Sequence, residues 1–248
     1  MNTTPARVAL VTGSSRGIGA AIARRLAADG IAVVVNYAGR AAEAGKVVAE
    51  IEAAGGRALA VQADVSSPAA VASLFDQAEA AFGGVDILVN NAGIIQPGIV
   101  PLADTDDALF DRLVAINLKG TFNTLRLAAK RLRAGGRIVN FSTSVVGLAS
   151  PGYAIYAATK SAVETMTLIF AKELRGRGIS VNAVAPGPTA TDLFLDGKTP
   201  EQVAHLARLA PLERLGQPDD IAGVVAFLAG PAGGWVNGQT LRVNGGLV

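Results

Sequence analysis

Short apolar runs alternate with helical patterns along the whole chain, and this alternation constrains the fold more than any other feature. The runs are rich in Val, Ile, Leu and Ala without strict polar alternation, as expected of strands that are covered on both faces. Repeated strand–helix units predict a parallel sheet with right-handed crossovers. We expect strands at 7–12, 31–36, 57–63, 85–90, 137–143, 179–184 and 239–243, and helices at 18–29, 41–54, 68–82, 106–133, 156–175 and 218–229.

The composition favours one domain and argues against several classes of function. With 248 residues, of which 50% are hydrophobic, the chain can bury one large core, and we expect residues 1–248 to form a single α/β domain. Cysteine is absent and His205 is the only histidine, which excludes disulfides, thiol catalysis and a His-based metal cluster. The formal net charge is +2 without a Lys/Arg run, so no nucleic-acid partner is expected. Without a leader pattern or an apolar run of about 18 residues, we expect no membrane partner and a cytoplasmic location.

A glycine-rich turn follows the first apolar run. Residues 12–19 read Thr-Gly-Ser-Ser-Arg-Gly-Ile-Gly and lead into a helical pattern. Backbone N–H groups at such a turn, with the positive end of the helix dipole, can bind a pyrophosphate. Gly13 would allow the tight turn, Gly17 would let phosphate approach, and Gly19 would let helix and strand pack closely. On spacing alone, a nucleotide site and a plain strand–helix turn both stay open.

A second candidate site lies downstream, where Tyr156 and Lys160 are four residues apart and would share one face of a helix. A Lys ammonium beside a phenol favours the phenolate, which would lower the Tyr pKa from about 10 toward neutrality. The phenol would then serve as a general acid or base. An apolar run that ends in the hydroxyls of residues 142–144 precedes this pair.

Together these segments resemble the short-chain dehydrogenase/reductase family, over essentially the whole chain. Within the family, the chain looks most like NADPH-dependent carbonyl reductases related to trihydroxynaphthalene and 3-oxoacyl reductases. The resemblance implies a doubly wound Rossmann fold with a seven-stranded parallel sheet and helices on both faces. It also implies a homotetramer that pairs the helices near 106–133 and 156–175. The matching segments are the TGxxxGxG turn, Asn90-Asn91-Ala92-Gly93, Asn117, the YxxxK pair, Pro186-Gly187 and Val243-Asn244-Gly245-Gly246.

The second strand and the glycine turn bear on the choice of cofactor. NAD-preferring relatives end this strand with an acidic residue, whereas Asn36 and Tyr37 stand here. Arg16 and Arg40 suit a ribose 2′-phosphate, so we expect NADPH/NADP+; the alternative is that both arginines are solvated and the site is permissive. No metal is expected. The implied cofactor-binding residues are Gly13, Ser15, Arg16, Gly17, Ile18, Gly19, Asn36, Tyr37, Asp64, Val65, Asn91, Ala92, Gly93, Tyr156, Lys160, Pro186, Gly187, Thr189 and Thr191.

The resemblance also implies a catalytic set. Tyr156 would donate a proton to a carbonyl oxygen, Lys160 would hold the ribose and lower the Tyr pKa, and Asn117 would hold a water that links Lys160 to solvent. Counting back from Tyr156 places the assisting hydroxyl at Thr143, whereas the family's Ser-Val-Val-Gly text begins at Ser144. Successive strand side chains face opposite sides, so only one should reach the substrate, and both stay candidates.

The predicted reaction is reduction of a neutral ketone, aldehyde or 3-oxo ester to an alcohol. The loop at 189–200 and the amphipathic stretch at 201–209 are expected to form a mobile lid. Three alternatives stay open: an NAD-linked alcohol or sugar dehydrogenase, a 3-oxoacyl-carrier-protein reductase, and a non-catalytic ligand-binding regulator on the same fold. The expected pocket walls are mostly apolar and comprise Ile94, Ile95, Gln96, Leu148, Ala149, Tyr153, Pro188, Leu193 and Phe194.

Overall fold

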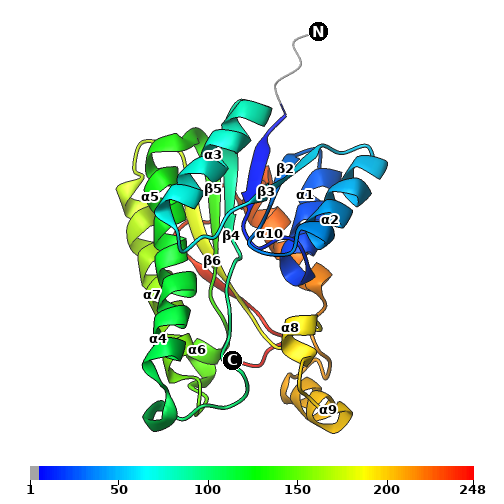
Figure 1. The fold of residues 1–248 in the computed structure, drawn as a ribbon, viewed down its shortest axis with the longest axis vertical. Helices are drawn as coiled ribbons and strands as arrows, with labels where there is room; N and C mark the ends of the chain where they lie inside the picture. Colours follow the sequence, from blue (N-terminus) through cyan, green and yellow to red (C-terminus); the bar gives the residue numbers. More distant parts are fainter. Residues whose placement is uncertain (1–5) are drawn as a thin grey trace.

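The computed structural model describes residues 6–248, and its centre is a parallel sheet (Figure 1). Seven strands lie in the order β3-β2-β1-β4-β5-β6-β7, and every neighbouring pair is parallel. The order runs outward in both directions from β1 and β4, so the point where it reverses lies between these two strands. The strands are β1 Val8–Val11, β2 Ala32–Tyr37, β3 Ala58–Gln62, β4 Val85–Asn90, β5 Leu132–Phe141, β6 Ser180–Pro186 and β7 Thr240–Val243.

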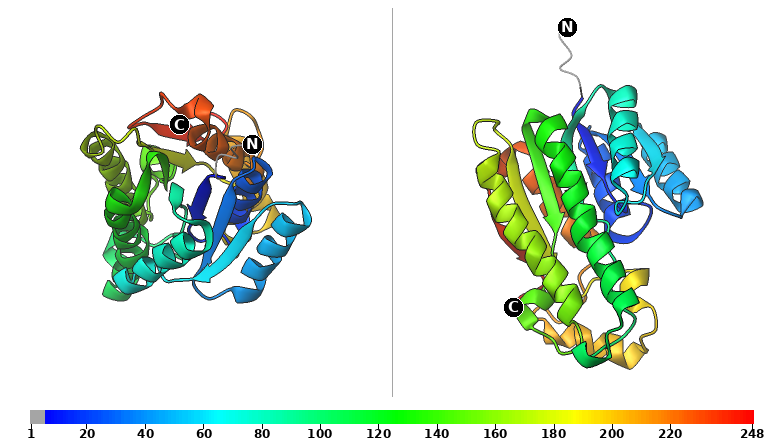
Figure 2. Two further views of the ribbon diagram at one scale, coloured as in Figure 1. Left: turned by 90° about the horizontal axis from the view of Figure 1, so that it is seen from above. Right: turned by 60° about the vertical axis from the view of Figure 1, so that its left-hand side comes forward.

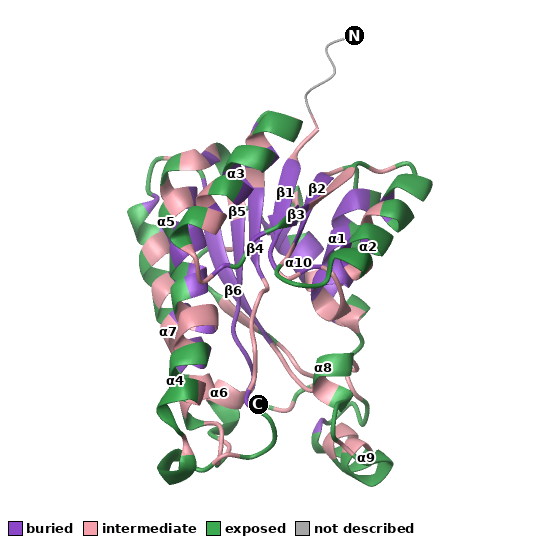
Figure 3. Ribbon diagram, in the orientation of Figure 1, coloured by how far each residue is buried: buried purple, intermediate pink, exposed green. Residues whose placement is uncertain are grey.

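Helices cover both faces of the sheet, as the apolar strands predict (Figures 1 and 2). Alternate residues of β1 point into the hydrophobic cores on opposite faces of the sheet. Ala9 and Val11 pack with helices α1, α2 and α10, whereas Val8 and Leu10 pack with α3, α5 and α7. The strands are therefore buried on both sides, which Figure 3 shows as a continuous buried centre. The covering helices are α1 Gly17–Ala28, α2 Ala41–Ala53, α3 Pro68–Phe82, α5 Gly120–Arg131, α7 Ala154–Glu173 and α10 Pro218–Ala229.

The long helix expected at 106–133 is interrupted. Helix α4, Asp107–Leu113, runs into a π-helical turn, Val114–Lys119, before α5 begins. Strand β5 then starts at Leu132 rather than at 137, and its pairing with β4 is irregular between Val85 and Ile87. An apolar pattern with a period near 3.6 cannot distinguish one wide turn from a regular helix, so the sequence concealed the interruption.

Three further helices lie beyond the carboxyl ends of the strands (Figure 1). They are α6 Val145–Leu148, α8 Asp192–Leu195 and α9 Pro200–Leu209. The short helices α6 and α8 were not predicted, whereas α9 coincides with the expected amphipathic stretch. Thr191 caps α8 and Thr199 forms a capping box with Gln202 at α9, so local side-chain bonds define both helix starts. None of the described helices is long and apolar enough to cross a membrane.

Candidate active site

The glycine turn after β1 is pressed against the loop that follows β4. A Cβ added at Gly13 would lie 2.8 Å from Ala92 Cα, and one at Gly19 would lie 2.5 Å from Asn91 Nδ2. That Asn91 amide donates to the carbonyl oxygens of Thr12 and Gly13, both at 2.9 Å. Ala92 N in turn donates to Thr12 Oγ1 at 3.0 Å. Asn91 and Ala92 thus hold the turn from behind, a bracing role that the sequence reading left open for the asparagine.

The start of α1 is open to a phosphate-sized group. Gly17 is its first residue and has a φ of +55°, a conformation that glycine adopts most easily. Its missing Cβ faces Thr191, whose Cγ2 would be 3.5 Å away. Ser15, Arg16 and Ile18 are half-buried around this helix start. Free N–H groups and the helix dipole make this the place where a pyrophosphate fits, with Thr191 across from it.

Asn36 lies behind the turn with its amide fully engaged. It is 1% exposed. Its Oδ1 accepts a hydrogen bond from Gly13 N at 3.2 Å, and its Nδ2 donates to Val61 O at 3.2 Å and Ala63 O at 3.0 Å. Asn36 therefore ties the glycine turn to the end of β3. Tyr37, the next residue, is half-buried.

A pocket of about 500 Å³ adjoins the glycine turn. Arg16 and Arg40 line one side of it, and the residues of α8 and the following loop line the other. The Arg40 guanidinium is half exposed and makes one long ion pair, 3.7 Å, with Glu43. Both cations can therefore turn toward a phosphate in this pocket. The lining from the α8 side comprises Asp192, Leu193, Leu195, Asp196 and Gly197.

The loop after β3 carries Asp64 and Val65. Asp64 is exposed, and its Oδ1 accepts hydrogen bonds from the Ser66 N–H and hydroxyl, both at 2.8 Å. Val65 is buried, and its carbonyl accepts a hydrogen bond from Asn123 Nδ2 at 2.9 Å. A Cβ at Gly120 would lie 2.7 Å from Val65 Cγ2, so α5 supports this loop closely. The sequence reading missed Asn123, since one Asn within a helical pattern carries no signal.

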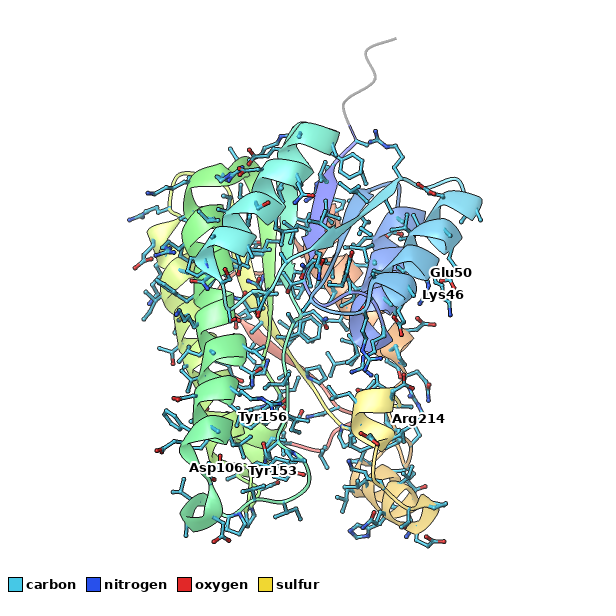
Figure 4. All side chains as sticks on the ribbon, viewed as in Figure 1. Lys46, Glu50, Asp106, Tyr153, Tyr156 and Arg214 are labelled. Carbon is cyan, nitrogen blue, oxygen red and sulfur yellow. The ribbon has the colours of Figure 1, made fainter. Side chains whose placement is uncertain are left out.

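Tyr156 lies on the first turns of α7, near α4 and α6 (Figure 4). Its phenol lies beside the side chain of Thr143, two residues past the end of β5, and Thr143 acts to lower the pKa of the phenol. The neighbouring Ser144 hydroxyl is engaged elsewhere: it donates to Ala185 O at 3.2 Å and accepts from Asn244 Nδ2 at 2.9 Å. The two hydroxyls thus face different surroundings, and Thr143 is the one brought to Tyr156. Both residues lie past the end of β5, and Ser144 has helical backbone at the start of α6, so the expected strand alternation does not apply to them.

Burial dominates the protonation of this pair. It raises the pKa of Tyr156 above its usual value; the neighbouring Thr143 hydroxyl opposes this rise and the neighbouring Tyr153 phenol adds to it. Burial also lowers the pKa of Lys160 to about 8. The sequence predicts that Lys160 lowers the Tyr156 pKa, but in the structure the surroundings of Tyr156 raise it. The Lys160 Nζ instead donates to Phe141 O at 2.9 Å.

Asn117 lies in the π-helical turn and is fully buried. Its Oδ1 accepts from Ile94 N at 2.8 Å and its Nδ2 donates to Ile94 O at 2.9 Å, so the side chain clamps the loop after β4. A Cβ at Gly93 would lie 3.2 Å from Asn117 Oδ1 and 3.3 Å from Lys160 Nζ. Gly93 therefore lets the loop, Asn117 and Lys160 converge on one spot.

The loop after β6 forms the opposite wall. A Cβ at Gly187 would lie 2.7 Å from Asn244 Cβ, so the loop packs tightly on the C-terminal segment. Thr189 is buried, its hydroxyl donates to Gly187 O at 2.9 Å, and Thr191 caps α8. Pro186 ends β6 beside this wall. Asn244 links the wall to Ser144 through a hydrogen bond. The sequence analysis gives Asn244 no role beyond its place in the C-terminal segment Val243-Asn244-Gly245-Gly246 that resembles the family.

The arrangement fits a dinucleotide stretched over the carboxyl ends of β1, β4 and β6. Glycines stand where a side chain would obstruct, cations line the pocket by β2, and an acid–hydroxyl pair stands at the end of β5. Among residues 6–248, no group of three or more His, Cys, Asp or Glu side chains could hold a metal ion.

Comparisons with known proteins agree with this geometry. A family model described as enoyl-(acyl carrier protein) reductase matches residues 13–248. The NADPH-dependent aldehyde reductase-like protein, chloroplastic, of Arabidopsis thaliana is 50% identical over 254 residues, covering 98% of the chain and 94% of the relative. Versicolorin reductase of Emericella nidulans is 44% identical, covering 97% and 95%.

A solved structure supports the same family assignment. The short chain dehydrogenase from Burkholderia cenocepacia in complex with NADP has a TM-score of 0.91 and 42% identity, and 97% of each chain is covered. The chain therefore belongs to the short-chain dehydrogenase/reductase family. The predicted family and the predicted doubly wound Rossmann fold are both confirmed.

Proposed function

We propose that this protein is an NADPH-dependent carbonyl reductase that converts a neutral ketone, aldehyde or 3-oxo ester to an alcohol. One observation carries the proposal. Tyr156 is paired with the Thr143 hydroxyl on the helix that also presents Lys160, at the sheet end that holds the glycine turn. An acid, an assisting hydroxyl and a buried cation at that place are what carbonyl reduction needs.

The nicotinamide cofactor, when bound, supplies the hydride that adds to the carbonyl carbon. Tyr156 donates its proton to the carbonyl oxygen, and the Thr143 hydroxyl donates a hydrogen bond to the same oxygen. The raised pKa of Tyr156 keeps the phenol protonated at neutral pH, as a proton donor must be. Lys160, with a pKa of about 8, is mostly charged at pH 7, and this buried ammonium would hold the ribose hydroxyls of the cofactor. Asn117 holds the loop through which water would return the proton.

The preference for NADPH rests on charge at the end of β2. Arg16 and Arg40 line the pocket where the ribose phosphate would lie, and the strand ends in Asn36 and Tyr37 without a carboxylate. The Arabidopsis relative is named as NADPH-dependent and the Burkholderia structure contains NADP, which supports the same choice. An NAD-linked dehydrogenase would be expected to have a carboxylate at this strand end.

The substrate mouth is apolar. Exposed aliphatic side chains come from the loop after β4, from α6, and from α8 and the segment after α9, which lie at one end of the molecule (Figure 1). Such a rim favours a neutral, hydrophobic carbonyl compound over a phosphorylated one. The aliphatic side chains are Ile99, Leu102, Leu148, Leu193, Leu195 and Leu212.

Assembly and location belong to the same proposal. Residues 1–248 form one domain, and four such chains assemble into a homotetramer in the cytoplasm. Exposed apolar side chains on α4, α5 and α7 support pairing of these helices: Phe110, Phe122, Leu168 and Ile169. Light scattering coupled to gel filtration measures the tetramer, and fractionation of cells measures the location.

The test of function is the loss of NADPH absorbance with a panel of neutral ketones, aldehydes and 3-oxo esters, and NADH measured in parallel. Turnover with NADPH that Tyr156→Phe abolishes supports the proposal. Equal or better rates with NADH contradict the choice of cofactor. Tight NADPH binding without turnover on any class of carbonyl favours the regulator alternative instead.

A further inference from the structure

Gln96 is a buried amide that the proposed chemistry does not use. It lies in the loop after β4 and is 5% exposed. Its Nε2 donates to Gly152 O at 2.7 Å, and Val100 N donates to the same carbonyl at 3.2 Å. Gly152 directly precedes Tyr153, the N-cap residue of α7, and α7 carries Tyr156 on its first turn. Residues 96–100, here called the strap, therefore hold the segment that leads into the catalytic helix.

Gly152 is adapted to this contact. Its φ is +81°, and a Cβ there would lie 2.3 Å from Ile99 Cγ2 and 3.2 Å from Val100 N. Any side chain at this position would push the strap away. Strap and helix start thus meet at backbone distance, so a change in the strap displaces the start of α7.

The oxygen end of the Gln96 side-chain amide has no hydrogen-bond partner among the described residues, 6–248. Gln96 Oε1 is buried and accepts no hydrogen bond from residues 6–248. Leaving such a buried acceptor unpaired costs free energy, which a bound water would recover. Gln96 also lines a cavity of about 10 Å³, next to Thr105 and Tyr156. The Thr105 hydroxyl donates to Pro101 O at 3.1 Å, which leaves its oxygen free to accept.

That cavity has the size and the polarity for one water molecule. A volume of roughly 10–15 Å³ on this scale holds a single water, provided that polar partners are present. A water there can donate one hydrogen bond to Gln96 Oε1 and one to Thr105 Oγ1. The remaining lining is apolar and confines the water: Val100, Leu109, Leu113, Ala154 and Ile155, with the Gly152 backbone.

We propose that Gln96 is a positioning residue for Tyr156, with its Nε2 holding Gly152 and its Oε1 holding one buried water between the strap, α4 and the start of α7. The kinetic part rests on the proposed carbonyl reductase activity. The water site does not, so the two can fail separately. Gln96 acts through the helix start and touches no reacting atom.

The kinetic test compares Gln96→Met with Gln96→Glu. Methionine keeps the length and loses both hydrogen bonds, so we expect kcat to fall about tenfold while KM for NADPH stays within about twofold. In Gln96→Glu, a neutral carboxyl can donate to Gly152 O and accept from the water, whereas a carboxylate cannot donate. Burial raises a carboxyl pKa above about 4.3. The rate relative to wild type should therefore be higher at pH 6 than at pH 8.

The controls separate positioning from folding. Gln77→Met removes an exposed hydrogen bond from the Gln77 side-chain amide to the Ser73 hydroxyl on α3, and it should leave kcat unchanged. Thermal melting in NADPH checks that each variant is folded. Among the described residues that line the cavity, Tyr156 is the one titratable group, so its own titration also changes the rate with pH. The pH profiles of wild type and Gln96→Met measure that contribution and are compared with the profile of Gln96→Glu. A Gln96→Met enzyme with wild-type kcat, or a pH-independent loss in Gln96→Glu, would overturn the positioning role.

A crystal structure of the wild-type protein tests the water site without any assay. An ordered water within hydrogen-bond distance of Gln96 Oε1 supports it, and loss of that water in Gln96→Met supports it further. A dry cavity contradicts it. If wild type reduces no carbonyl compound, the proposed function fails, yet the crystal structure still decides whether the water site exists.

Discussion

The sheet end that carries the glycine turn and the lid above it, defined as residues 191–209, are held by different kinds of contact. The turn is fixed by buried hydrogen bonds from Asn36 and Asn91 and by Cβ-free backbone contacts. In the lid, every residue of α8 and α9 is exposed or half-buried (Figure 3). The difference indicates that the chemistry lies on a buried, hydrogen-bonded part of the molecule, whereas the fit to a substrate lies on the more exposed lid. The buried part, here called the platform, comprises the glycine turn, the strand ends behind it and the start of α7.

The platform extends through the sheet as a buried polar chain. Thr124 on α5 donates to Asn90 at 2.7 Å, Asn90 to Asn140 at 2.8 Å, and Asn140 to Thr167 on α7 at 2.8 Å. All four side chains are nearly or fully buried. Satisfied buried networks of this kind fix relative positions, so the helix of Tyr156 is tied to β4 and β5.

The largest expected effect comes from the platform, with Tyr156→Phe. The change removes the proton donor and leaves the ring, so kcat should fall about 10²–10⁴-fold. Binding of NADPH, measured by fluorescence titration, should change little. Tyr153→Phe is the matched control, and it should retain most activity. Comparable losses in both variants would show that the two phenols share the task and that the platform is less specialised than described.

How much of this platform could be predicted depended on local signals. The turn at Gly13–Gly19 and the pair Tyr156 and Lys160 follow from short-range spacing, and the structure brings them to one sheet end. The π-helical turn around Asn117 could not be predicted, because one widened turn leaves the apolar pattern intact. The direction of the Tyr156 pKa depends on burial, which the spacing of two residues does not encode.

The choice between Thr143 and Ser144 shows the same limit. The sequence leaves both open, since counting back from Tyr156 points to Thr143, whereas the Ser-Val-Val-Gly motif begins one residue later at Ser144. Only the tertiary contacts distinguish them: the Tyr156 phenol on one side, and Asn244 on the other.

The second prediction concerns the free energy cost of burying Lys160 in the platform. Its pKa is about 8 in the folded state and about 10.5 when unfolded. Between these values the unfolded chain binds more protons, so stability should rise with pH from 8 to about 10.5, on the order of 3 kcal/mol. Below pH 8 the penalty is fully present. Urea unfolding at pH 8, 9 and 10 measures the slope, and Lys160→Met should flatten it. An equal slope in both proteins would contradict the assignment.

The third prediction compares the two neighbouring hydroxyls of the platform, those of Thr143 and Ser144. Thr143→Val removes the hydroxyl that lies beside the Tyr156 phenol, and we expect kcat to fall about 10²-fold with little change in melting temperature. Ser144→Ala breaks bonds to Ala185 and Asn244 and should lower stability by about 1 kcal/mol with a smaller kinetic effect. Steady-state kinetics and thermal melting on both variants measure the split. The reverse pattern would make Ser144 the assisting hydroxyl.

The fourth prediction lies where the platform meets the lid. Arg40→Ala removes a cation from the pocket that adjoins the glycine turn, so KM for NADPH should rise about tenfold while KM for NADH stays the same. Arg24→Ala, which loses only an exposed ion pair with Glu50, is the matched control. A similar rise for both cofactors would mean that Arg40 does not distinguish them.

The smallest effects on the fold are expected in the lid, with Leu195→Ser on α8. The side chain is 39% exposed and the Thr191 cap remains, so unfolding free energy should change by no more than about 0.5 kcal/mol. Because Leu195 also lines the pocket beside Arg16 and Arg40, the assay is run at saturating NADPH. KM should then rise a few-fold for a large apolar ketone and stay nearly constant for a small one, because only the large compound reaches the rim. Kinetics on a homologous series of alkyl ketones measures this dependence on size.

The control is Ala222→Ser, which places a hydroxyl on the buried face of α10. It should lower the free energy of unfolding without changing the size preference. If instead the lid variant unfolds as readily as the α10 variant, the lid is part of the rigid platform and the contrast between the two regions does not hold.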